Sequence, residues 1–228
     1  MNHPRPPRGS VDNVAPSSEA GSFRRILRKC YRHASVGAYL LTSGKGARRT
    51  MNLNPAGLEF GQVPASQFSM WTRRFVFPGD WDRQLIRIEN HSVYRSMSDH
   101  FLNGLAWEET LHYREAMTRL KVGSSFRGFT TPEQTKDLFQ GWDRLYESIK
   151  TDGFRGTGEL YRLGLIDDPR KCFDEITVNI ARDGAIILND GWHRFCMARI
   201  LGIPSIPVRL LVRHRLCDQP LAIEICES

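Results

Sequence analysis

The spacing of apolar residues is most regular in the last third of the chain. Residues 175–180 alternate between apolar and polar positions and are rich in β-branched side chains, which is typical of a strand. The turn residues Arg182-Asp183-Gly184 separate this strand from a second apolar run, so the two runs predict a hairpin. A run with helical spacing and a further apolar run follow. The predicted order is strand, turn, strand, helix and strand, at residues 175–180, 182–184, 185–188, 191–201 and 206–212, which is an α/β unit.

Upstream of this unit, the chain predicts extended segments over 58–76 and then helices. The clearest helix start is Thr131-Pro132, an N-cap residue followed by proline at the first helical position, and Asp152-Gly153 should end that helix. The helices are expected over residues 92–102, with Ser92 as the cap, 107–120 and 132–150. We therefore predict an α/β (α+β) fold in which a small mixed sheet, containing the hairpin–helix–strand unit, is wrapped by N-terminal helices.

The chain divides into three segments by composition. Residues 1–20 are rich in Pro, Ser and Asn and are expected to be a disordered tail. Residues 21–50 predict a basic amphipathic helix and a linker, and residues 51–228 a single domain. The arginine-rich face of the helix over 22–41 suits either packing on the body or docking on an anionic membrane surface.

Charge and cysteine content narrow the class of protein. The net charge is +7, but residues 1–50 carry ten Lys and Arg against two acids, while the rest carries 22 against 23. The excess therefore comes from one segment, which weakens an assignment to nucleic-acid binding by the body. Five cysteines without C-x-x-C spacing argue against a zinc site and a disulfide framework, so no protein-bound metal is expected. With no long apolar run, a cytoplasmic protein is predicted, peripheral at the membrane if 22–41 docks there.

The segment Asp190-Gly191-Trp192-His193-Arg194 carries the strongest chemical signal. It stands where a strand turns into a helix, with Asp190 as the expected N-cap. Gly191 lets the backbone approach a ligand, and the first helical turn offers N–H groups to an anion. His193 and Arg194 oppose the helix dipole unless an anion neutralises them. The alternative is structural: Arg194 pairs with a carboxylate such as Asp190, and His193 is a wall residue.

Two stretches of sequence resemble the ParB/sulfiredoxin superfamily. They are IARDGAIILNDGWHRFCMARILGIPSIPVRLLVRH (180–214), with its D-G-x-H-R turn, and LYESIKTDGF (145–154), and the likeness covers roughly 135–214. The His-Arg version of the turn is most similar to the ParB-like small-molecule kinases. That resemblance implies ATP or another nucleoside triphosphate with Mg²⁺, Asp190 as a catalytic carboxylate, and Gly191, His193 and Arg194 as phosphate-binding residues. Sulfiredoxins have a Cys where this chain has Trp192, so sulfinate reduction is not expected.

A second candidate lies in GDWD (79–82). Asp80 and Trp81 could bind a polyol or sugar, and Asp82 could act as an acid or base beside Asp190. The alternative is a capping turn in which Trp81 packs and the acids bond to the backbone.

These features favour one function among several. The first hypothesis is a nucleotide-binding phosphotransferase, with ATP as the expected nucleotide, acting on a small hydroxyl-bearing molecule or a glycan. The alternatives are a ParB-like nucleic-acid-binding protein or nuclease, which the basic N-terminus favours, and a ligand-binding protein without catalysis.

Overall fold

The structure is a computed structural model that describes residues 49–63, 67–69, 72, 74–168, 171 and 174–218. The predicted tail over 1–20 and almost all of the predicted basic segment over 21–50 lie outside the described residues. In the part that is described, no helix is long and apolar enough to cross a membrane.

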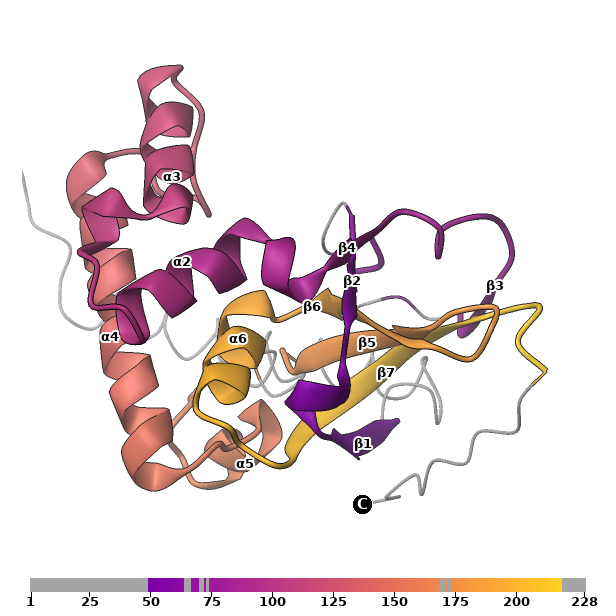
Figure 1. Cartoon of the computed structure of the whole chain (residues 1–228). Helices are drawn as coiled ribbons and strands as arrows, with labels where there is room; N and C mark the ends of the chain where they lie inside the picture. Colours follow the sequence, from indigo (N-terminus) through magenta and orange to yellow (C-terminus); the bar gives the residue numbers. More distant parts are fainter. Residues whose placement is uncertain are drawn as a thin grey trace, which may run out of the picture.

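A mixed sheet forms the centre of the fold (Figure 1). Its seven described strands are β1 (Thr50–Leu53), β2 (Phe60–Gln62), β3 (Val76–Phe77), β4 (Leu85–Arg87), β5 (Ile176–Ile180), β6 (Ile186–Asp190) and β7 (Ile206–His214). The strand order is β1-β7-β5-β6-β2-β4, and β3 pairs with β7. β5 runs antiparallel to β6 and parallel to β7, which confirms the predicted hairpin, helix and strand and the mixed α/β class.

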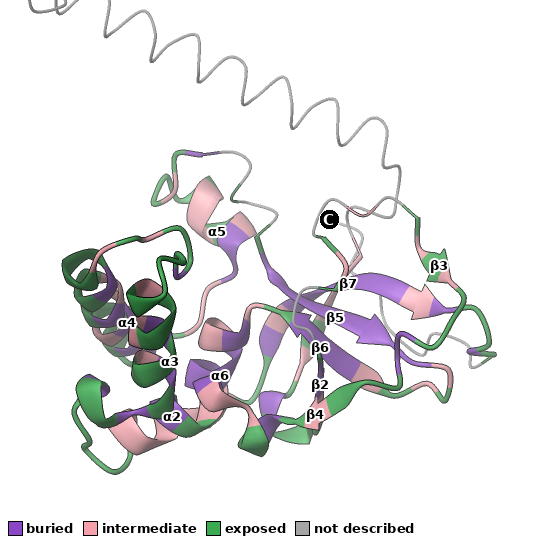
Figure 2. Ribbon diagram, turned by 90° about the horizontal axis from the view of Figure 1, so that it is seen from above, coloured by how far each residue is buried: buried purple, intermediate pink, exposed green. Residues whose placement is uncertain are grey.

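Helices gather beside the sheet in two layers (Figures 1 and 2). They are α2 (Ser92–Phe101), α3 (Leu111–Lys121), α4 (Pro132–Asp152), α5 (Thr157–Arg162) and α6 (Trp192–Ile200). α6 packs on β5, and α2 and α4 pack on α6. The helices upstream of the hairpin therefore cover the α6 layer, as the sequence predicted.

α6 lies at the centre of the hydrophobic core. Its consecutive residues Phe195 to Ala198 are completely buried and join the main core with Ile176 and Val178 of β5. Cys196 is among them, as predicted, and its burial raises the pKa of the thiol. Figure 2 shows β5, β6 and β7 mostly buried as well. Because both neighbouring layers are packed, the start of α6 is held in a fixed position.

Away from the main core, the central strands carry a buried polar network beside a smaller apolar cluster of Trp81, Leu211 and Val212. The Asn179 side chain donates to Gln62 Oε1 at 2.8 Å and to Asn189 Oδ1 at 3.2 Å, and all three residues are fully buried. Asn189 also donates to Thr177 Oγ1 and to the Phe68 carbonyl, both at 3.0 Å. This network ties the segment around Phe68 to the sheet and fixes the pairing of β5 with β6.

Two predicted helix boundaries are wrong. The cap of α2 is His91, whose Nδ1 accepts a hydrogen bond from Val93 N at 3.2 Å, and Ser92 is already helical. The helix predicted over 107–120 is a 3-10 turn, Trp107–Glu109, followed by α3, because Thr110 between them has extended backbone angles. The prediction for 132–150 is confirmed: Thr131 Oγ1 accepts from Gln134 N, and Gly153 follows the last residue of α4.

Candidate functional site

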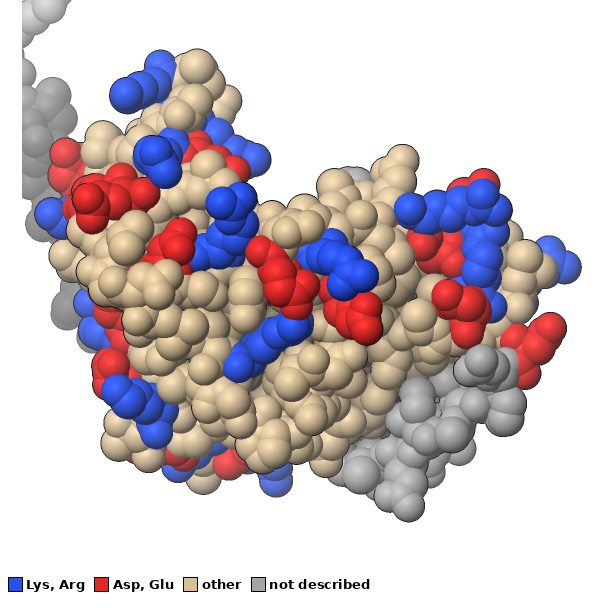
Figure 3. All heavy atoms as spheres, in the orientation of Figure 1, with Lys and Arg blue, Asp and Glu red and all other residues tan. Residues whose placement is uncertain are grey.

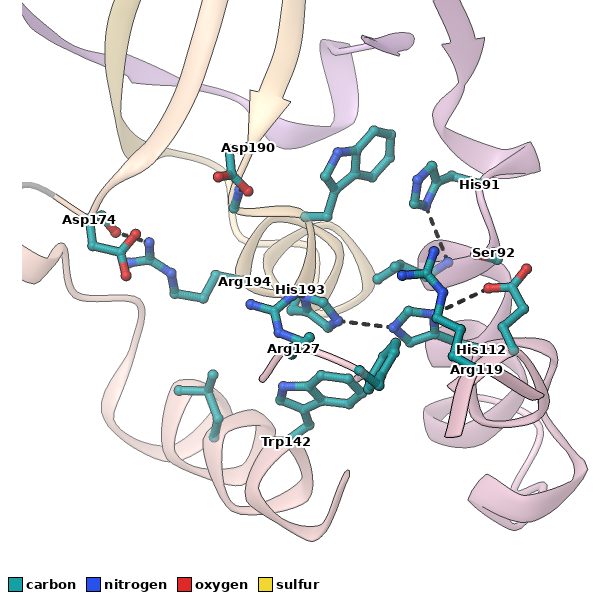
Figure 4. A pocket seen from close by; sticks show the side chains of 16 residues that line it. His91, Ser92, His112, Arg119, Arg127, Trp142, Asp174, Asp190, His193 and Arg194 are labelled. Carbon is teal, nitrogen blue, oxygen red and sulfur yellow. Dashed lines mark hydrogen bonds and ion pairs between the residues drawn. The ribbon is translucent and has the colours of Figure 1, made fainter. Parts of the chain in front are cut away.

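A cavity of about 550 Å³ opens at the N-terminal end of α6 (Figure 4). Its walls come from the starts of α2 and α6, from α3 and α4, and from the turn between α3 and α4. Asp190, Gly191, His193 and Arg194 all line it. The structure thus brings four of the sequence-predicted site residues to one cavity.

Gly191 has the backbone geometry that this turn requires. Its φ is +86°, in the left-handed region, and a Cβ at this position would lie 2.9 Å from Ile176 Cα. Gly191 is also the N-cap of α6, so the prediction that Asp190 caps the helix is wrong. The Asp190 carboxylate instead accepts from Gly191 N at 2.7 Å. No side chain caps α6. No side-chain acceptor therefore competes with a ligand for the N–H groups of its first turn, which lies at the cavity.

His193 is held on three sides. Its ring stacks on Trp142 of α4, with centroids 4.1 Å apart, and its Nε2 lies 3.2 Å from His112 Nε2 of α3. Its Nδ1 lies 3.3 Å from a guanidinium nitrogen of Arg127. Burial and then the Arg127 charge lower the pKa of His193 well below its ordinary value. His193 is therefore a neutral ring at pH 7.

Arg127 is presented by a strained turn. Phe126 and Phe129 exchange two backbone hydrogen bonds of 2.9 Å, so Arg127 and Gly128 form a two-residue turn between them. Arg127 has φ +51°, and it is the one non-glycine residue with positive φ in the described part of the chain. Phe126 anchors the turn in the core. Such strain is common at functional sites, where the surrounding structure holds a side chain in place.

Arg194 is committed to the wall of the cavity. One guanidinium nitrogen donates to the Asp174 carbonyl, and the other lies 3.8 Å from Glu175 Oε2. Arg194 thus pairs with a carboxylate, as the structural alternative expected, but the partner is Glu175 and not Asp190. Arg127, which the sequence did not single out, is the guanidinium next to His193.

Two carboxylates stand at the rim opposite the histidines. Asp174 and Asp190 are both exposed and line the cavity on the side that Figure 4 shows away from His112. Desolvation raises the pKa of Asp174, and the charge of Asp190 adds to the rise although Arg194 opposes it. Among the described residues, no group of three or more His, Cys, Asp or Glu is placed to hold a metal ion. Mg²⁺ needs only one or two carboxylates when phosphates supply the other ligands, and Asp174 and Asp190 fit that requirement.

Several cavity residues had no signal in the sequence. They come from elements that lie 50 to 100 residues before α6 and share no motif with it: His91, His112, Glu115, Arg119, Arg127 and Trp142. The Phe-Arg-Gly-Phe run at 126–129 could have been recognised as a tight turn, but not as part of this site.

The GDWD segment does not join this cavity. Asp82 is buried and pairs with Arg182, which follows β5 at the hairpin turn, whereas Asp190 ends β6 at the other end of the hairpin. Five residues of strand separate the two ends, roughly 16 Å. The expectation that Asp80 or Asp82 completes the Asp190 site is therefore wrong.

The two carboxylates of GDWD bind Arg182, which lies in the hairpin turn between β5 and β6. Asp82 accepts from Arg182 N at 2.8 Å and from its guanidinium at 2.6 Å, and Asp80 accepts from the same guanidinium at 2.7 Å. Burial alone would raise the pKa of Asp82, but the Arg182 hydrogen bonds outweigh it and lower the pKa to about 2. Trp81 packs edge-on against Phe68, which agrees with the capping-turn alternative. Asp80 also lines a smaller hollow of about 360 Å³ with Arg182 and His214.

One face of the described part of the protein carries mixed charge. Figure 3 shows Lys and Arg interspersed with Asp and Glu over the face that it presents, without a continuous basic stripe. This agrees with the near balance of 22 bases and 23 acids after residue 50.

Comparison with protein-family models, with curated proteins and with solved structures finds no match for this chain. The resemblance of residues 180–214 to the ParB/sulfiredoxin superfamily thus stays a prediction from the motifs themselves.

Proposed function

We propose that the cavity binds the phosphate groups of a nucleoside triphosphate and that the protein is a phosphotransferase acting on a small hydroxyl-bearing molecule or a glycan. One observation carries the proposal: the strained Arg127 and the uncapped N-terminus of α6 meet at a cavity whose opposite rim holds two carboxylates. Phosphoryl transfer requires this combination of anion binding and a carboxylate near the acceptor.

The anion-binding side is built from three elements. Arg119 comes from α3, Arg127 from the following turn, and the first-turn N–H groups from α6. Arg194 also lines the cavity, but Asp174 and Glu175 hold its guanidinium in the wall. A guanidinium donates to two phosphate oxygens at once, and a helix N-terminus adds N–H donors and a favourable dipole. The neutral His193 adds no charge of its own, so phosphate would be bound by the arginines and the backbone.

The carboxylate side supplies the proton acceptor. As the acceptor hydroxyl attacks the terminal phosphorus, the bond from phosphorus to the bridging oxygen breaks, and the hydroxyl proton passes to a carboxylate. Asp190 is placed for this at the end of β6, with one oxygen held by Gly191 N and the residue exposed to the cavity. Mg²⁺, held by phosphates with Asp174 or Asp190, would supply charge neutralisation.

The nucleic-acid alternative rests on residues before 49, outside the described part of the chain. On the face that Figure 3 presents, bases and acids are interspersed, which does not favour a nucleic-acid interface there.

Turnover tests the proposal. Purified protein is incubated with each nucleoside triphosphate, Mg²⁺ and a pool of small polyols and sugars, and phosphorus NMR follows the terminal phosphate. We expect a new phosphate ester and the nucleoside diphosphate, with the rate falling at least 100-fold in Asp190→Asn, which keeps an oxygen for Gly191 N. Asp99→Asn, a half-buried aspartate on α2 that does not line the cavity, is the matched control. Transfer that survives Asp190→Asn, or a chain that binds a triphosphate and transfers nothing, would refute the assignment.

A further inference from the structure

A chain of polar contacts, two hydrogen bonds and one ion pair, runs from Arg127 through two histidines to a carboxylate. Arg127 lies 3.3 Å from His193 Nδ1, and His193 Nε2 lies 3.2 Å from His112 Nε2. His112 Nδ1 then lies 3.5 Å from Glu115 Oε2, one turn further along α3. Figure 4 shows the labelled part of this chain, from Arg127 across His193 to His112, along one wall of the cavity.

Arg127, at one end of the chain, determines which ring nitrogen of each histidine carries the proton. A guanidinium has only donors, so His193 Nδ1 accepts and the single ring proton of His193 is on Nε2. That proton is donated to His112 Nε2, which must accept, so the ring proton of His112 is on Nδ1 and faces Glu115. The two neutral rings are therefore different tautomers, with the proton on Nε2 in His193 and on Nδ1 in His112, and both assignments follow from the contact with Arg127.

Arg127 also blocks further protonation. A second proton on His193 could only go to Nδ1, where it would face the guanidinium, and one on His112 could only go to Nε2, where it would face the His193 proton. The other charged or titratable groups around the two rings are His91 before α2, Arg119 on α3, and Arg194, Asp174 and Asp190 around the start of α6. Of these, His91 disfavours a charge on either ring.

We propose that anion binding at Arg127 is coupled to the uptake of one proton by His193, with His112 and Glu115 as positioning residues that stabilise the imidazolium. The proposal rests on the proposed phosphate cavity and names the group in it that carries a proton. An anion that takes the N–H donors of Arg127 releases His193 Nδ1, and a proton from the buffer can bind there.

Only Arg127 has to move for this change. Once Arg127 has turned toward the anion and Nδ1 carries a proton, Nδ1 donates to the bound anion, while His193 Nε2 still donates to His112 and His112 Nδ1 still faces Glu115. The two histidine rings keep their orientation, and the negative charge of Glu115 lies at the far end of the polarised chain. A doubly charged tetrahedral anion is favoured, because it can accept from Arg127 and His193 together.

Calorimetry with sodium sulfate tests the coupling on the full 228-residue chain. Sulfate stays fully ionised near pH 7, so any proton taken up on binding goes to the protein. Comparing two buffers of different ionisation enthalpy at pH 7 gives the number of protons per bound sulfate, and we expect about one. In His193→Asn, sulfate should still bind through Arg127 and α6, with the uptake lost. Glu115→Gln should reduce the uptake, and Glu108→Gln, an exposed glutamate beside α3, should not.

The outcomes separate this inference from the proposed function. Sulfate that binds without proton uptake overturns the coupling and leaves the phosphate cavity standing, whereas a chain that binds no sulfate overturns both. Nitrogen NMR of the ligand-free protein at pH 7 checks the geometry without any variant. We expect His193 protonated on Nε2 and His112 on Nδ1, and the reverse pair of tautomers would contradict the chain.

Discussion

Acid should destabilise this protein through the histidines of the cavity, and His112 gives the size of the effect. His112 is 8% exposed, and its ring lies between Phe126 and Trp142. Burial lowers its pKa to about 4, although Glu115 pulls in the opposite direction. The fold therefore holds His112 neutral at a pH where the unfolded chain, with a pKa near 6.5, already binds a proton.

The sign and magnitude follow from these two values. Below pH 6.5 the unfolded state binds more protons than the folded state, so stability is complete above that pH and is lost as the pH falls toward 4. A shift from 6.5 to about 4 corresponds to about 3 kcal/mol at 1.36 kcal/mol per pKa unit. The pKa values of His193 and His91 are lowered in the same direction and add to the loss.

Urea unfolding at a series of pH values measures the effect. The free energy of unfolding should fall between pH 7 and pH 4, and in His112→Gln the fall should be smaller by about 3 kcal/mol. His112→Gln will itself be less stable at pH 7 because the stacked ring is gone, so the comparison uses the change with pH. Equal pH dependence in the two proteins, with unchanged urea slopes, would show that His112 is not held neutral by the fold.

Two further predictions concern the hairpin turn and the start of α6. Asp82→Ala removes the buried partner of Arg182. It should lower the free energy of unfolding, measured in urea, by about 2 kcal/mol, because the pKa of Asp82 is lowered from 3.8 to about 2 in the fold. Asp80→Ala, at an exposed site on the same guanidinium, should cause no resolvable change, and equal losses would refute the structural role of Asp82. Gly191→Ala combines a left-handed backbone with a contact to Ile176, and should cost more than the 1–2 kcal/mol or so expected from backbone strain alone. Gly202→Ala at the other end of α6, where a Cβ meets open space at φ +65°, measures that strain by itself, and equal costs would show that the approach of Gly191 to β5 is not tight.

The sequence predicted well those features that depend on neighbouring residues. The hairpin, α6 and β7 follow from spacing within about 40 residues, and the Thr131 cap of α4 from adjacent ones. Asp190 and Gly191 both suit the cap of α6 by sequence. In the structure Asp190 still belongs to β6, and the left-handed backbone and the close approach to Ile176 place the glycine at the cap.

Contacts between distant segments decided what the sequence could not. The sequence allows Asp82 a catalytic role, but the structure pairs it with Arg182, 100 residues further along the chain. His193 was predicted as a cationic phosphate ligand, yet Arg127 and Trp142, both on other elements, make it a neutral stacked ring. The residues that define the surroundings of His193 are therefore ones that only tertiary structure brings to the motif.

Thermal stabilisation by nucleotides tests the central claim, that the cavity at the start of α6 binds phosphate groups. A panel of nucleoside triphosphates, with and without Mg²⁺, is applied to the wild type, to Arg127→Ala and to Arg114→Ala, an exposed arginine on α3 that does not line the cavity. A ligand at 100 times its dissociation constant adds about 2.7 kcal/mol, an easily measured shift. We predict stabilisation of the wild type and of Arg114→Ala, and its loss in Arg127→Ala. Equal stabilisation of all three proteins, or of none, would contradict the account.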